Sequence, residues 1–109
     1  MPTTYKVLGQ VNPSATTATT LYTVPGATQA VLSSVVVCNQ TAVAATFRLA
    51  VRVAGASLTA AQYVAYDVTV GASDSTALTL GLTMGATDVL TVYASTATLS
   101  FSAYGSEIA

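Results

Sequence analysis

The chain contains the segment Val43-Ala44-Ala45-Thr46-Phe47-Arg48-Leu49-Ala50-Val51-Arg52-Val53. Its odd-numbered positions are all apolar, whereas its even-numbered positions carry only alanine, threonine and arginine. A hydrophobic period of two is typical of a strand with one face on a core and the other facing outward. We therefore predict a long strand over residues 43–54, with Arg48 and Arg52 on its outer face.

The same period recurs on both sides of this segment. Over residues 62–70 it places Val64, Tyr66, Val68 and Val70 on one face, and near the end of the chain Leu99, Phe101 and Ala103 alternate with polar residues. Residues 31–38 are apolar on both faces apart from a pair of serines, which predicts a strand covered on two sides.

Turn signals separate these segments. Gly-Ala-Ser or Gly-Ala-Thr occurs at residues 26–28, 55–57, 71–73 and 85–87, and glycine is the residue that best tolerates a positive φ. Pro25-Gly26 suits the two central positions of a type II turn. The unequal spacing of the triplets indicates turns and not a sequence repeat.

These patterns predict one all-β domain over residues 1–109, an antiparallel β-sandwich of jelly-roll type with about eight short strands. The expected strands lie roughly at residues 4–9, 20–25, 30–39, 43–54, 61–70, 75–82, 88–95 and 97–104. No segment has a helical period with caps.

The chain carries very little charge. Three basic and four acidic side chains make up 6% of its residues, and the formal net charge is -1, whereas average globular domains hold about 25% charged residues. Without a basic patch, we expect no nucleic-acid partner. The apolar runs are far shorter than the ~20 residues of a spanning helix, so we expect no membrane partner either.

The residues that support catalysis are scarce. The chain has no histidine and a single cysteine, Cys38, which excludes Ser-His and Cys-His nucleophile pairs and zinc sites built from His and Cys. Asp74 and Asp88 stand beside glycine-containing turns, where aspartate usually bonds its own backbone. Cys38 lies in an apolar run, which favours a small buried side chain. We therefore expect no enzyme, no cofactor and no metal.

Low charge together with many apolar strand residues indicates association with other chains. Charged residues also protect sheet edges from pairing, and here few strands have any. We take the outer face of the strand over 43–54 as the candidate interface, formed by Thr46, Arg48, Ala50 and Arg52. Charge added at Thr46 or Ala50 is then expected to weaken assembly more than folding.

Several segments resemble small virion structural proteins of tailed bacteriophages, and the similarity extends over nearly the whole chain. The similar segments are Leu8-Gly9-Gln10, Leu21-Tyr22-Thr23-Val24-Pro25, Val35-Val36-Val37-Cys38-Asn39, Phe47-Arg48-Leu49-Ala50-Val51-Arg52, Tyr66-Asp67, Ala86-Thr87-Asp88-Val89, Val92-Tyr93-Ala94-Ser95, Phe101 and Gly105-Ser106-Glu107-Ile108.

This resemblance implies a structural component of a phage particle, made in the host cytoplasm and located in the virion. A capsid decoration or cement protein is the preferred type, with a homotrimer as the expected form and the major capsid protein as a partner. The alternative is a receptor- or glycan-binding module of a tail fibre or baseplate, in which Tyr63 and Tyr66 stack on sugars.

Overall fold

The computed structural model describes residues 2–109 and confirms the predicted all-β sandwich. Its strands are β1 (Thr3–Val11), β2 (Thr19–Thr23), β3 (Gln29–Asn39), β4 (Ala45–Arg52), β5 (Tyr63–Val70), β6 (Ser75–Met84), β7 (Val89–Ala94) and β8 (Leu99–Ile108). Two 3₁₀ turns, Val53–Gly55 and Ala60–Gln62, lie between β4 and β5.

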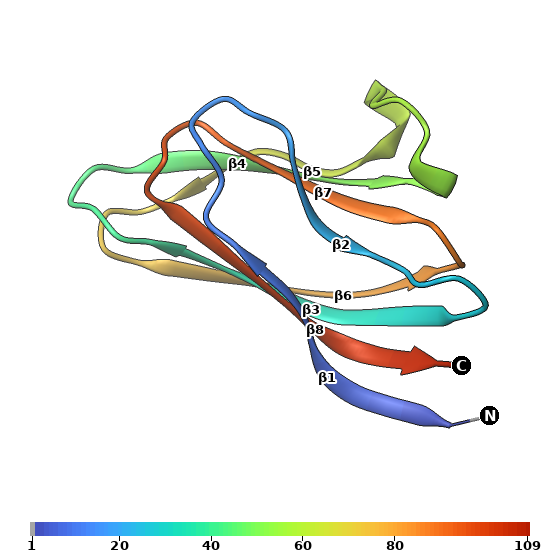
Figure 1. The fold of residues 1–109 in the computed structure, drawn as a ribbon. Helices are drawn as coiled ribbons and strands as arrows, with labels where there is room; N and C mark the ends of the chain where they lie inside the picture. The colour runs from blue at the N-terminus through green and yellow to red at the C-terminus, as the bar shows by residue number, and fades with distance from the viewer. Residues whose placement is uncertain (1) are drawn as a thin grey trace.

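The strands form two four-stranded antiparallel sheets. The first sheet has the order β1-β8-β3-β6 and the second has the order β2-β7-β4-β5. Each strand of the first half of the chain pairs with one of the second half: β1 with β8, β2 with β7, β3 with β6 and β4 with β5. This arrangement is that of a jelly roll, and Figure 1 shows its two layers with the chain termini side by side on β1 and β8.

The core fills the space between the sheets. Phe47 of β4 and Phe101 of β8 meet edge to face, with ring centroids 5.8 Å apart, a favourable geometry for aromatic pairs. The rest of the core consists of alternate residues of the strands, chiefly valine, leucine and alanine. The period of two that the sequence shows therefore corresponds to one face in the core and one face outward.

β4 is shorter than the sequence predicts. Val43 and Val53 were expected on its core face, but they are 70% and 67% exposed and lie outside the strand. At one end the side-chain amide of Asn39 binds the carbonyl of Val43 and draws it into the loop. At the other end Ala54 and Gly55 both have positive φ and turn the chain away from the sheet.

The turns also differ from the prediction at residue level. In three of the four Gly-Ala-Ser/Thr triplets a residue after the glycine takes the positive φ: Ala27, Ser73 and Thr87. Gly26 does not, so the predicted type II turn over Pro25-Gly26 is wrong. Only at Gly55 does the glycine of a triplet use its conformational freedom.

β3 was predicted to be covered on both faces, and the single chain covers only one. Its buried residues alternate with residues that are half-buried or exposed, because β3 is an inner strand of the first sheet with the core on one side only. Cys38, expected to be buried, is half-buried on the outer face of this sheet.

Candidate functional site

The four residues predicted as an interface all point outward from β4, on the second sheet. Phe47 and Leu49 between them are fully buried in the core. Thr46 is half-buried, and its backbone is tied to Ser95 by two hydrogen bonds of 2.9 Å, one of them to the serine hydroxyl. That these four residues contact another chain remains a prediction.

Arg48 is held within its own chain. Its Nε donates to Oδ1 of Asp67 at 2.7 Å. The guanidinium carbon lies 4.1 Å from the ring centroid of Tyr66 and 4.4 Å from that of Tyr93, so it is stacked between two aromatic faces. The bond to Asp67 raises the pKa of Arg48. This arginine is a permanently charged group whose position its own chain fixes.

A bulge in β5 builds this cluster. Phe47 pairs with Val68 and Leu49 pairs with Ala65, so β5 has one more residue than β4 between these pairs. Asp67, at φ 52°, accommodates the extra residue. Tyr66 therefore lies beside Arg48 on the outer face, and the prediction that it shares a face with Val68 and Val70 is wrong.

Arg52 and Ala50 are also engaged internally. Arg52 donates from Nε to the hydroxyl of Thr91 at 3.0 Å and from Nη1 to the carbonyls of Gly55 and Ala56. Ala50 is only 1% exposed and lies between Thr91 and Tyr63 in the sheet. Of the four predicted residues, only Thr46 therefore combines partial exposure with a side chain that makes no hydrogen bond.

The outer face of the first sheet has a different character. Residues directly opposite each other across the strands point to the same side, and four such rows form this face. They are Tyr5–Ser106–Val31–Thr83, Val7–Tyr104–Ser34–Thr79, Gln10–Ser102–Val36–Ala77 and Ser100–Cys38–Ser75. None of these side chains is charged.

The charges of the first sheet lie on its other side. Lys6 pairs with Gly105 and Glu107 pairs with Thr4, in the rows that face the second sheet. There Nζ of Lys6 is 2.9 Å from Oε1 of Glu107, and Glu107 also accepts a hydrogen bond from the hydroxyl of Tyr22 in β2. We call the uncharged outer rows the neutral face.

Two hollows open on or beside the neutral face. One, of about 370 Å³, lies over β8 and is bordered by Tyr5, Val31, Tyr104 and Ser106. Tyr5 is 84% exposed, the most of the exposed large apolar residues. This hollow is mostly apolar and has two tyrosines on its walls.

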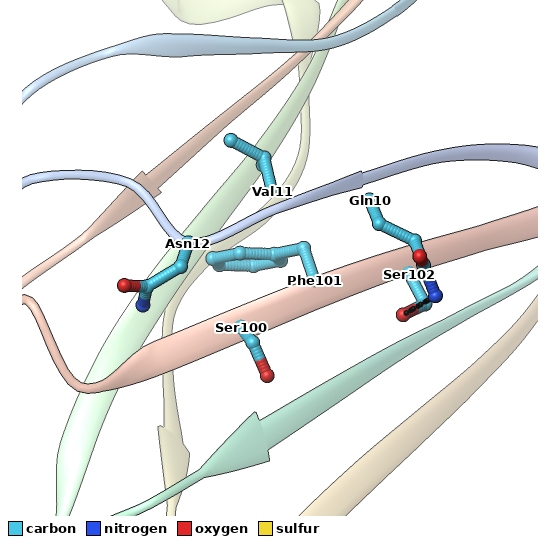
Figure 2. A pocket seen from close by; sticks show the side chains of 6 residues that line it. All are labelled: Gln10, Val11, Asn12, Ser100, Phe101 and Ser102. Carbon is cyan, nitrogen blue, oxygen red and sulfur yellow. Dashed lines mark hydrogen bonds between the residues drawn. The ribbon is translucent and has the colours of Figure 1, made fainter.

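The second hollow, also about 370 Å³, is bordered by Gln10, Asn12, Ser100 and Ser102. Figure 2 shows Gln10 bonded to Ser102, with Asn12 and Ser100 further along. The amide of Asn12 donates to the carbonyl of Leu99 at 2.6 Å. No titratable group borders this hollow, so it offers hydrogen bonds and no acid–base chemistry.

The carboxylates expected in turns do bond the backbone. Asp74 accepts from the amide of Ser75 at 2.8 Å, and Asp88 accepts from the amides of Gly85 and Ala54, each at 2.9 Å. Within residues 2–109, no group of three or more His, Cys, Asp or Glu side chains is arranged to hold a metal ion. No helix in the described part of the chain is long and apolar enough to cross a membrane.

The neutral face does not follow from the sequence alone, although part of its signal is visible there. Ser100, Ser102, Tyr104 and Ser106 alternate with mostly apolar residues and include no charge. The sequence does not show that three other uncharged strand faces lie beside this one.

Comparison with protein-family models gave no match for this chain. Comparison with curated proteins also gave none.

Proposed function

We propose that this chain is a structural component of a phage particle, a capsid decoration or cement protein that stabilises the assembly through protein–protein contacts. The observation that carries the proposal is the neutral face, in which four adjacent strands present no charged side chain. The resemblance of the chain to virion structural proteins supplies the type of assembly. In this role the chain needs neither a catalytic site nor a cofactor.

The composition of the neutral face suits a protein contact. Serine, threonine, alanine and valine are small and carry no charge, so covering them does not require stripping water from an ion. Modest contacts that repeat over a symmetric shell add through multivalency. The jelly roll is found in capsid proteins and also in lectins, so the fold by itself does not choose between structural and sugar-binding roles.

The test is the location of the chain in an infected or induced culture of its host. Particles are purified on a density gradient, and each fraction is examined for this chain by mass spectrometry. We expect the chain in the particle fraction at a fixed ratio to the major capsid protein. A chain found only among the free proteins at the top of the gradient would overturn the proposal.

A receptor- or glycan-binding module is the second candidate, and the pair of tyrosines on β5 beside Arg48 of β4 favours it. Tyr66 is 56% exposed, and its ring meets that of Tyr63 edge to face at 4.9 Å. Exposed, rigid tyrosines beside an arginine and a carboxylate are suited to sugar rings and hydroxyls. A glycan-array signal that Tyr66→Ala abolishes would support this candidate, and an array without signal would speak against it.

A further inference from the structure

We infer that the neutral face is a self-association surface, on which two copies of this chain pack by two-fold symmetry with Tyr5 of each copy in the hollow over β8 of the other. This inference rests on the proposed structural function and names the first partner of the chain as a second copy of itself. It replaces the homotrimer that the resemblance implies with a two-fold pair.

The absence of charge is what makes a second copy the best occupant. In a two-fold interface every residue near the axis meets its own kind, so a charged residue there would face a like charge. The neutral face has no such residue in any of its four rows. The outer face of the second sheet, by contrast, presents Arg48, Asp67 and Arg52, with Asp67 47% exposed.

The size of the face is sufficient. The molecule measures 45 × 27 × 19 Å, and Figure 1 shows the sheet of β1, β8, β3 and β6 as one of its two layers. A stable interface of standard size buries about 800 Å² on each partner. The strands of this sheet are 9 to 11 residues long. At about 3.3 Å per residue and about 4.8 Å between strands, the face measures roughly 33 × 19 Å, which is close to that area, whereas a sheet edge offers far less.

Tyr5 and the hollow provide the specific contact. Tyr5 is 84% exposed and stands on the edge strand β1, directly beside the hollow over β8. The hollow, of about 370 Å³, is open to solvent on one side and is mostly apolar, so a phenol ring can lie in it against Val31 and Tyr104. Because Tyr5 borders the hollow, an axis through the hollow brings Tyr5 of the second copy against Val31 and Tyr104.

The polar groups that border the hollow also suit a bound tyrosine side chain. The hydroxyls of Ser106 and Ser33 can bond the hydroxyl of a tyrosine. That of Ser33 donates to the carbonyl of Tyr104 and is still able to accept a hydrogen bond. Lys6 also borders the hollow, but its ammonium is engaged by Glu107 on the opposite side of the sheet.

Sedimentation velocity over a concentration series tests the inference with three variants. Ser102→Lys places a charge in the middle of the neutral face, and Tyr5→Ala removes the inserted ring. Thr69→Lys adds the same charge to an exposed position on the outer face of β5 and serves as the matched control. Thermal unfolding of each variant verifies folding, and Tyr5→Ala changes a side chain so exposed that folding does not depend on it.

We expect the wild-type protein and Thr69→Lys to sediment with twice the 10.9 kDa mass of one chain. The dissociation constants of Ser102→Lys and Tyr5→Ala should rise at least tenfold. A wild-type protein that remains a single chain at millimolar concentration would overturn the inference, as would a mass of three chains or equal effects of Ser102→Lys and Thr69→Lys.

Different outcomes would overturn the two-fold packing and the role in a phage particle. A single chain in solution that still co-purifies with particles removes the two-fold packing and leaves the structural role intact. A dimer that is sensitive to Tyr5→Ala, but is absent from every particle, keeps the packing and removes the virion role.

Discussion

The hydroxyl of Tyr22 donates a hydrogen bond to the carboxylate of Glu107. Tyr22 belongs to β2 of the second sheet and Glu107 to β8 of the first, so this bond links the two layers near the chain termini. Lys6 of β1 contacts the other oxygen of the same carboxylate at 2.9 Å. Three strands thus meet at one acidic group.

Tyr22→Phe should lower the free energy of unfolding at pH 7 by about 1 kcal/mol, the usual worth of a hydrogen bond to a partly exposed group. The bond from Tyr22, followed by that from Lys6, holds the pKa of Glu107 below its usual value. A lowered folded-state pKa contributes stability that is complete above the pKa of an unfolded glutamate and is lost as pH falls through the folded-state pKa.

The difference between wild type and Tyr22→Phe should therefore shrink as the solution is acidified through that range. Urea unfolding at a series of pH values measures it. Tyr63→Phe removes a hydroxyl for which the described residues provide no hydrogen-bond partner, and it is the control. A Tyr22→Phe deficit that stays constant down to pH 2 would contradict the assigned role of Glu107.

Asp67 combines a backbone role and an electrostatic role, and two substitutions separate them. Asparagine tolerates the positive φ of 52° and loses only the ion pair with Arg48, so Asp67→Asn should cost little, as is usual for ion pairs that solvent screens. Valine is β-branched and disfavours positive φ. Asp67→Val should therefore cost about 2 kcal/mol.

Chemical denaturation of both variants measures these costs. If Asp67→Val and Asp67→Asn are equally stable, the bulge of β5 is not strained at this position. Far-ultraviolet circular dichroism shows whether the strands persist in each variant.

Much of the fold could be predicted from the sequence because local patterns encode it. The period of two in β4 and β8 places Phe47 and Phe101 in the core, and short polar segments with glycine separate the strands. The bulge at Asp67 could not be predicted in this way, because nothing in the neighbouring sequence distinguishes an aspartate at positive φ from an aspartate in a regular strand.

The other features that could not be predicted depend on contacts between residues far apart in the sequence. Asn39 is 2% exposed, and its amide nitrogen lies within hydrogen-bonding distance of the carbonyls of Val43, Val70 and Gly71. In the sequence it is only a polar residue after an apolar run. The neutral face likewise depends on strand order: β1 and β8 are at opposite ends of the chain, and only pairing places Val7 beside Tyr104.

Gly105 marks a close approach of two strands, and alanine there should be strongly destabilising. A Cβ atom at Gly105 would lie 2.1 Å from the carbonyl oxygen of Val31, so the backbone of β3 or β8 would have to shift. Overpacking of this kind costs about 3 kcal/mol. At Gly26 a Cβ atom would meet nothing within 4 Å, so Gly26→Ala should change stability by less than about 0.5 kcal/mol. Thermal unfolding of the two variants compares them, and equal melting temperatures would show that the strands can separate at Gly105 without cost.

Ala50→Glu should impair folding itself, contrary to the expectation from sequence that charge at this position acts mainly on assembly. Ala50 is 1% exposed and its neighbour Thr91 is 5% exposed, so a carboxylate at position 50 would be buried. It could pair with Arg48 or Arg52 only if these side chains gave up the bonds they already make, Arg48 to Asp67 and Arg52 to Thr91. An unpaired buried charge costs several kcal/mol, and we expect a loss of about 3 kcal/mol or a chain that does not fold. Thr46→Glu, at a half-buried position on the same face, should stay within about 0.5 kcal/mol of wild type. Urea unfolding of the two glutamate variants decides the matter, because similar midpoints would mean that the outer face of β4 is open at Ala50 and can serve as the interface that the sequence suggests.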